Sequence, residues 1–183
     1  MVGPPAQAAP LRDGTFSVVD PGEAIDVMVE TPKGSRKKYE YDHERHVMRL
    51  DRRLASSTLF PADYGFVPDT SSQDGEALDA LVLADDPTAP GTVVSVRPVG
   101  VFWIETAGGR EAKILAVPHG DPVWAEVEDI DDVPSHLRAE IENFFEVYKR
   151  LEPKTDPKSG GFEDRAAAQR EIAGARDRYR SGA

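Results

Sequence analysis

Apolar and polar residues alternate along the first half of the chain, a pattern typical of half-buried β-strands. The alternation is clearest over residues 25–30 and returns over residues 38–41, after a turn rich in proline and glycine. Further short strands are predicted at residues 47–51, 79–83, 92–104 and 113–117. The longest of these contains Pro98 and Gly100, so it is expected to bend or to form a strand pair. So many short strands before any helix favour a compact barrel over a βαβ sheet.

Two amphipathic helices are predicted in the last third of the chain. The first is expected to begin near Asp132, to tolerate Pro134 in its first turn and to stop at Pro153. Spacings of three and four place its apolar residues on one face: Leu137, Ile141, Phe144, Phe145, Tyr148 and Leu151. The second is expected from about Glu163 to Tyr179, with arginines at the end that the helix dipole favours. The predicted fold class is therefore mainly β with flanking helices.

Length and composition predict one domain. The chain has 183 residues, which suit a single core, and we assign this domain to residues 21–183. Residues 1–20 are rich in Pro, Gly and Ala without an apolar period, and we expect them to form a disordered extension. The chain has no cysteine, no signal-peptide pattern at its start and no window of about 18 apolar residues. These features predict a cytoplasmic protein.

The charge balance narrows the choice of partners. The chain carries 33 acidic and 22 basic residues, a net charge of −11. This balance repels nucleic acid phosphates and anionic lipids, so we expect neither a nucleic acid nor a membrane partner. A small phosphate can still bind if cations gather in one pocket, or if acidic residues recruit metal ions.

The segment Asp74-Gly-Glu-Ala-Leu-Asp79 holds three carboxylates within six residues. Asp-Gly favours a turn, and hard divalent cations prefer oxygen ligands, so the segment is a candidate metal loop. Taken alone, a solvated turn is the better interpretation, because aspartate populates turns for backbone reasons.

Other candidates are also weak one by one. Strand alternation places Lys38 and Glu40 on one face, but an exposed ion pair explains them equally well. His43 and His46 have no third ligand close in sequence and are interpreted as polar surface. The remaining candidates are Arg52 as a planar phosphate fork, Tyr64 in a rigid turn after Pro61, and the adjacent pair Tyr148 and Lys149. The sequence has no Walker loop, GxGxxG, GxSxG or HExxH motif.

The order of these pieces is more specific than any one of them. Glu-x-Pro, Lys-Tyr-Glu, Asp-Arg, Phe-Pro-Ala-Asp-Tyr-Gly-Phe, Asp-Gly-x-x-x-Asp, Arg-Pro-Val-Gly, Ala-Lys-x-x-Ala-Val-Pro and Phe-Phe-x-x-Tyr-Lys follow one another along the chain. Over about residues 24–180 the chain thus resembles the soluble (family I) inorganic pyrophosphatases. The resemblance implies a five-stranded OB-like β-barrel with flanking helices, and a homo-oligomer, normally a hexamer in bacteria.

The resemblance also implies an activity and a set of site residues. The activity is hydrolysis of pyrophosphate to two phosphates by a metal-activated water, with several Mg²⁺ ions and with Mn²⁺ or Co²⁺ as substitutes. The catalytic positions of the family match Glu76, Asp79, Tyr64, Lys38 and Arg52. The positions that bind the phosphates match Lys38, Arg52, Tyr64, Lys113, Tyr148 and Lys149. The metal positions match Asp74, Asp79, Glu30, Glu40 and Glu111, with Glu105 as a substitute ligand.

Four positions depart from the family pattern. Glu76 and Glu111 stand where aspartates are expected, Thr106 replaces a metal-binding aspartate next to Glu105, and Phe60 replaces a tyrosine. A carboxylate shifted by about an ångström can change the rate on the order of 10²-fold. Two alternatives therefore stay open: a related phosphoanhydride or phosphate-ester hydrolase, and a non-catalytic paralogue that binds phosphate.

Overall fold

The computed structural model describes residues 24–153 and 156–182. The predicted extension, residues 1–20, lies outside the described residues. The elements along the chain are β1 (Ile25–Thr31), β2 (Lys37–Asp42), β3 (Val47–Arg53), β4 (Asp63–Val67), β5 (Leu78–Val82), β6 (Val93–Thr106), β7 (Gly109–Pro118), the 3₁₀ helix η1 (Ile130–Asp132), α1 (Ser135–Val147), β8 (Lys158–Glu163) and α2 (Arg165–Ser181). None of the described helices is long and apolar enough to cross a membrane.

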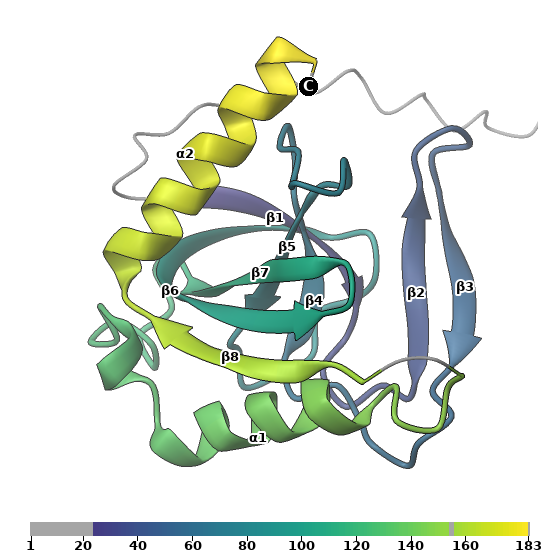
Figure 1. The fold of residues 1–183 in the computed structure, drawn as a ribbon. Coiled ribbons are helices and arrows are strands. Elements are labelled where there is room, and N and C mark those ends of the chain that lie inside the picture. Colours follow the sequence, from purple (N-terminus) through teal and green to yellow (C-terminus); the bar gives the residue numbers. More distant parts are fainter. Residues whose placement is uncertain (1–23, 154–155, 183) are drawn as a thin grey trace, which may run out of the picture.

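Five strands close on one another to form a barrel (Figure 1). The main sheet has the order β1-β4-β5-β7-β6-β8, and β1 also pairs with β6, which joins the ends of the five-stranded part. All pairings are antiparallel except that of β5 with β7. The sixth strand, β8, pairs with β6. This arrangement confirms the predicted five-stranded barrel.

Strands β2 and β3 form a separate two-stranded hairpin that stands beside the barrel (Figure 1). Lys37 pairs with Arg53 at the base of the hairpin and Asp42 with Val47 at its tip. Alternation predicted the first of these strands, and the second was expected as a short strand over residues 47–51. Both are half-buried or exposed because one side faces the barrel and the other faces solvent.

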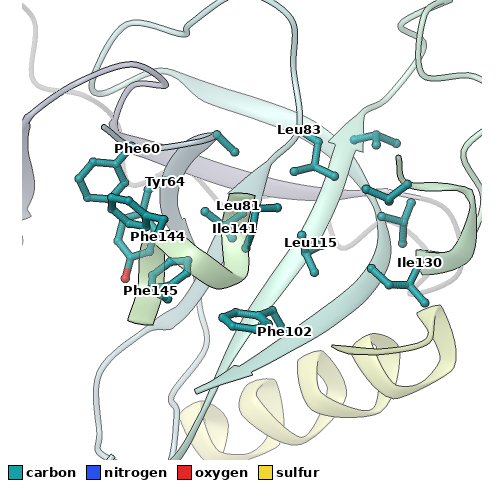
Figure 2. Close-up of a cluster of buried hydrophobic side chains, with 14 of the residues drawn as sticks. Phe60, Tyr64, Leu81, Leu83, Phe102, Leu115, Ile130, Ile141, Phe144 and Phe145 are labelled. Atoms are coloured by element: carbon teal, nitrogen blue, oxygen red, sulfur yellow. The ribbon is translucent and has the colours of Figure 1, made fainter. Parts of the chain in front are cut away.

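The two helices cover different parts of the barrel and bury different clusters. Figure 2 shows the cluster beneath α1, in which Ile141, Phe144 and Phe145 pack against strand residues such as Phe102. The second cluster contains Ile172 and small residues of α2 such as Ala168. The predicted apolar faces of both helices are thus confirmed for their central residues.

The structure corrects the first helix at both ends. Helix α1 begins at Ser135, because η1 occupies residues 130–132 and Pro134 stands at the N-cap. It ends at Val147, since the next backbone bonds, from Arg150 to Val147 and from Glu152 to Lys149, are of the tighter i→i+3 kind. Leu151 therefore leaves the apolar face and is 70% exposed.

Two strands were not predicted, β4 and β8. Every residue of β4 is buried, so the segment shows no alternation, and Tyr64 lies in this strand and not in the rigid turn expected for it. Strand β8 reads Lys-Ser-Gly-Gly-Phe-Glu, a composition that resembles a loop. Both form because neighbouring strands offer partners for their backbone groups, which local sequence does not report.

Candidate active site

A polar pocket of about 670 Å³ collects most of the predicted site residues. Its walls come mainly from β1, β2, β4, β5, β7, the loop before β5 and the residues that follow α1, with single residues from β6, α1 and α2. The predicted residues that line it are Glu30, Lys38, Glu40, Tyr64, Asp74, Glu76, Asp79, Glu111, Lys113, Tyr148 and Lys149. Segments more than a hundred residues apart in sequence therefore meet at one place.

The buried cation of the pocket is Lys113 on β7. Asp79 lies beside it on the parallel neighbour β5 and accepts a hydrogen bond from its Nζ. Glu111, two residues earlier on the same face, accepts from Nζ at 3.2 Å. Burial alone disfavours the ammonium, but the two carboxylates outweigh burial and raise the Lys113 pKa above its usual value. Lys113 is thus a permanent positive charge at the base of the pocket.

Glu30, at the end of β1, is the buried acid. Its Oε1 accepts a hydrogen bond from the Tyr41 backbone N–H at 2.8 Å, which ties β1 to the hairpin. Burial raises the pKa of Glu30 to about 7, and the nearby Asp79 carboxylate acts in the same direction. In the absence of a bound cation this carboxyl therefore titrates near neutral pH.

Lys38 and Glu40 project from the hairpin on one face, as strand alternation predicted. The Lys38 ammonium contacts the Glu40 carboxylate and lies 3.7 Å from Asp51 on β3. Both residues line the pocket, so the pair lies in the site and is not merely an ion pair of the outer surface.

Two phenols line the pocket next to the aromatic cluster. Figure 2 shows Tyr64 beside Phe60 and Phe145, with its hydroxyl at the edge of the cluster. Burial raises the pKa of Tyr64 above its ordinary value and that of Tyr148 to about 12. Both hydroxyls therefore stay protonated at neutral pH and can donate hydrogen bonds. Phe60 also lines the pocket, with its ring 4.7 Å from that of Phe144.

The acidic loop before β5 makes a tight turn. Gly75 has φ of 86°, in the left-handed region, and its N–H donates to the Ser72 carbonyl at 3.1 Å. The Glu76 N–H donates to Asp74 Oδ1 at 3.0 Å. This turn holds Asp74 and Glu76 exposed at the pocket, whereas Asp79 belongs to β5.

Arg52 lies beside the pocket, outside the residues found to line it. Its guanidinium pairs with Asp51 at 3.1 Å and with Glu152 at 3.2 Å. It is near enough to Tyr148 and Lys149 for its charge to lower the pKa of both side chains, although burial is the larger influence on each. Arg52 thus stands at the edge of the site.

Glu105 is placed differently from the expectation. In the β6–β7 pairing, Glu105 lies opposite Arg110, while Glu111 lies opposite Ile104. Side chains alternate along a strand, so Glu105 and Glu111 belong to opposite faces of this pair. Glu105 is exposed and is absent from the described lining of the pocket. We therefore remove it from the proposed metal ligands.

Some lining residues were missed by sequence reasoning. On one wall the Arg110 guanidinium lies 4.0 Å from the centre of the Trp103 ring and 3.0 Å from Glu163. Glu171 of α2, Tyr41, His43 and Phe66 also line the pocket. No motif marked Arg110, Trp103 or Glu171, because only the barrel brings β6, β7 and α2 to one wall. Phe66 belongs to the Phe-Pro-Ala-Asp-Tyr-Gly-Phe motif, and His43 had been considered as part of a histidine pair, but neither was assigned to the site.

The donor chemistry of the pocket fits hard divalent cations. Carboxylates approach from β1, β2, β5, β7 and the acidic loop, and oxygen donors are the preferred ligands of Mg²⁺. In the arrangement observed, Lys113 holds Asp79 and Glu111, and Lys38 holds Glu40. Among the described residues, no three acidic or histidine side chains are yet gathered closely enough to hold an ion. The residue types therefore fit the metal, although Asp79, Glu111 and Glu40 are paired with lysines in this arrangement.

Known proteins with similar sequences and structures were compared with the chain. A family profile described as inorganic pyrophosphatase matches residues 27–180. The inorganic pyrophosphatase of Methanosarcina mazei is 51% identical over 153 residues, which cover 84% of this chain and 90% of that protein. That of Streptomyces coelicolor is 46% identical over 156 residues, covering 85% and 96%. The crystal structure of inorganic pyrophosphatase from Thermus thermophilus has a TM-score of 0.84 at 42% identity, covering 86% of this chain and 92% of that chain.

Proposed function

The chain belongs to the inorganic pyrophosphatase family, and we propose that its pocket hydrolyses inorganic pyrophosphate to two phosphates with the help of Mg²⁺. The single observation that carries this proposal is the pocket itself, in which lysines and carboxylates from distant segments face one another. Pyrophosphate is small and highly charged, so its hydrolysis needs positioning and charge neutralisation more than covalent chemistry. The side chains of the pocket are suited to positioning, and bound Mg²⁺ would supply the charge neutralisation.

We propose that Asp74, Asp79, Glu30, Glu40 and Glu111 hold the metal ions. Bound Mg²⁺ supplies the charge neutralisation and the activated water that the reaction needs, and Mn²⁺ or Co²⁺ are expected to substitute for it. The net charge of −11 is consistent with this division of labour. The acids would attract the cations, and the pocket would gain affinity for phosphate once its negative charge is offset.

The cationic and phenolic groups are proposed to bind the substrate. Lys38, Lys113 and Lys149 are lysines of the pocket, and Arg52 stands at its edge with a planar fork suited to phosphate oxygens. Tyr64 and Tyr148 keep their protons and can donate hydrogen bonds to phosphate. Glu76 is proposed to accept a proton from the attacking water at its carboxylate, because it is exposed at the pocket and carries no lysine partner in the described structure.

Release of phosphate from pyrophosphate, titrated with Mg²⁺, tests this function. Replacement of Asp79 by Asn keeps the size of the side chain but removes the carboxylate that pairs with Lys113. We expect Asp79→Asn to lower kcat by about 10²-fold or more, since a lost electrostatic contact in the site commonly costs this much. The matched control is Asp86→Asn, which changes an exposed acid outside the pocket and is expected to leave the rate unchanged.

The result is informative only if both variants remain folded, which circular dichroism of each purified protein establishes. The proposal would be refuted if the unsubstituted chain released no phosphate from pyrophosphate with Mg²⁺, Mn²⁺ or Co²⁺. Equal turnover in Asp79→Asn would show that the reaction takes place elsewhere. ATP and p-nitrophenyl phosphate serve as comparison substrates and are expected to react far more slowly than pyrophosphate.

Two broader properties belong to the same proposal. We infer that the chain forms a homo-oligomer, with a hexamer as the expected size; Val47 and Leu50 of β3 are large apolar side chains that stay 46% and 53% exposed in the single chain. We also place its activity in the cytoplasm, where its lack of cysteine would be unremarkable.

A further inference from the structure

The hydroxyl of Thr106 lies at the end of β6, within hydrogen-bonding reach of Glu111 of the pocket. Thr106 pairs with Gly109 across the β6–β7 turn, and its Oγ1 accepts a hydrogen bond from the Gly108 N–H at 3.2 Å. Two acceptors lie within reach of its single proton: the Gly109 carbonyl at 3.1 Å and Glu111 Oε1 at 3.3 Å. A hydroxyl has one proton to donate, so these two acceptors compete for it.

The Glu111 carboxylate has possible hydrogen-bond donors on both of its oxygens. Its Oε1 faces the Thr106 hydroxyl, and its Oε2 accepts from Lys113 Nζ at 3.2 Å. The Glu111 side chain is 41% exposed, so packing alone leaves it several rotamers. Two donors on opposite oxygens fix the plane of the carboxylate, and Lys113 links it in turn to Asp79. Glu111 lines the pocket, whereas Thr106 stands behind it, outside the residues found to line it.

We propose that Thr106 is a positioning residue that orients the Glu111 carboxylate toward the side of the pocket occupied by Lys113 and Asp79. The inference rests on the proposed function, because it assumes that Glu111 serves the metal site. It adds a role for a residue that touches neither substrate nor metal. Thr106 acts only through the carboxylate in front of it.

A hydroxyl suits this role better than an acid would. A carboxylate at position 106 would place a second negative charge next to Glu111 and raise the cost of keeping both ionised. The Thr106 hydroxyl instead carries no charge, and Glu111 Oε1 lies within reach of its proton at 3.3 Å.

Thr106 also supports the β6–β7 turn through Gly108 and Gly109, and the experiment must separate that role from the positioning of Glu111. Thr106→Val removes the hydroxyl at nearly constant volume, and Thr106→Ser keeps it. Each change is made in the unsubstituted chain, and Thr106→Val is also combined with Glu111→Gln. If Thr106 acts through Glu111, its replacement has little left to disturb in the double variant.

The readout is Mn²⁺ binding to the metal-free protein by isothermal titration calorimetry, without pyrophosphate. We expect Thr106→Val to weaken Mn²⁺ binding by about 3- to 10-fold, as expected for a partly exposed hydrogen bond to a charged group. Thr106→Ser is expected to stay within about twofold of the unsubstituted chain. In the Glu111→Gln background, Thr106→Val is expected to add less than about twofold.

An equal loss from Thr106→Val in both backgrounds would overturn the inference, since it would assign the residue to the turn alone. An unchanged affinity in Thr106→Val, a loss in Thr106→Ser as large as in Thr106→Val, or no Mn²⁺ binding by the unsubstituted chain would overturn it too. The test is separable from the proposed function. Coupling without phosphate release would refute pyrophosphate hydrolysis and leave the positioning role standing, and phosphate release without coupling would do the reverse.

Discussion

Burial acts on two charged residues of the pocket with opposite results. Lys113 is 5% exposed but has two carboxylates as partners, so it keeps its charge. Glu30 is 9% exposed and has one backbone donor, while the acids around it oppose its ionisation. The two residues differ in charge state because of their interaction partners and not because of how deeply they are buried, since desolvation penalises the charged form of both. Glu30 is therefore the group whose charge a bound cation would change most.

The stability of the metal-free protein is expected to depend on the protonation of Glu30. Its pKa is raised from 4.5 to about 7, so between these values the folded protein retains a proton that the unfolded chain releases. This stabilisation is complete below pH 4.5 and is lost as the pH rises through 7. The loss amounts to about 3 kcal/mol in the free energy of unfolding.

Urea unfolding at pH 5 and pH 8 in the presence of EDTA measures this contribution. Glu30→Gln keeps an acceptor for the Tyr41 N–H but cannot titrate. We expect the change in unfolding free energy between the two pH values to be smaller in Glu30→Gln than in the unsubstituted chain. An identical pH dependence in the two proteins would show that Glu30 titrates at its ordinary pKa.

Single residues were predictable where the strand pattern fixed their direction. Alternation placed Lys38 and Glu40 on one face of β2, and both line the pocket. The same rule places Glu105 on the face opposite Glu111, and Glu105 is absent from the described lining of the pocket. The contact between Arg110 and Trp103 could not be predicted from the sequence, since it depends on strand register and on the rotamer of a long side chain.

At the scale of elements, β4 shows what the sequence does not report. The strand is buried at every position and carries Gly65 between Tyr64 and Phe66, both of which line the pocket. Gly65 pairs with Val29 of β1, and a Cβ atom added at Gly65 would lie 1.9 Å from the Met28 carbonyl oxygen. The close approach of two backbones therefore depends on the absence of a side chain. The residues around Gly65 in the sequence do not predict this contact between the two backbones.

Gly65→Ala is expected to destabilise the protein by at least about 3 kcal/mol, because the obstacle is backbone and cannot rotate away. The control is Gly174→Ala within α2, where the nearest atom to the added Cβ is the far end of Arg178 at 3.4 Å. There the same change is expected to stabilise by up to about 1 kcal/mol through helix propensity. Chemical denaturation compares the two, and a Gly65→Ala protein as stable as the parent would contradict the close approach of β1 and β4.

At the scale of the molecule, the strand count and the order of helices were enough to predict a barrel with flanking helices. The number of short strands before the first helix favoured a barrel over a βαβ sheet, and the pairing of β1 with β6 closes the ring. Closure is also what assembles the site, since it brings Glu30, Asp79 and Lys113 together from three strands. The family resemblance predicted that these residues belong to one site. Their spacing along the chain alone did not predict this.

The excess of acid predicts how the whole molecule responds to metal. Acidic side chains outnumber basic ones around the pocket, and the chain as a whole carries a charge of −11. Mg²⁺ that binds the folded protein and not the unfolded chain stabilises it by about 2.7 kcal/mol at a concentration 100 times its Kd. For a domain of this size we expect a rise in Tm of about 5–10 °C.

Thermal unfolding in EDTA, in Mg²⁺ and in NaCl of equal ionic strength separates specific binding from screening. Salt relieves repulsion among surface charges in general, so NaCl is expected to produce only part of the shift. Asp74→Asn removes a proposed ligand from an exposed position and is expected to reduce the Mg²⁺-specific part, whereas Asp86→Asn is expected to keep it. A shift of the same size in NaCl would mean that the pocket acids only repel one another, since a dedicated metal site must distinguish Mg²⁺ from a general increase in ionic strength.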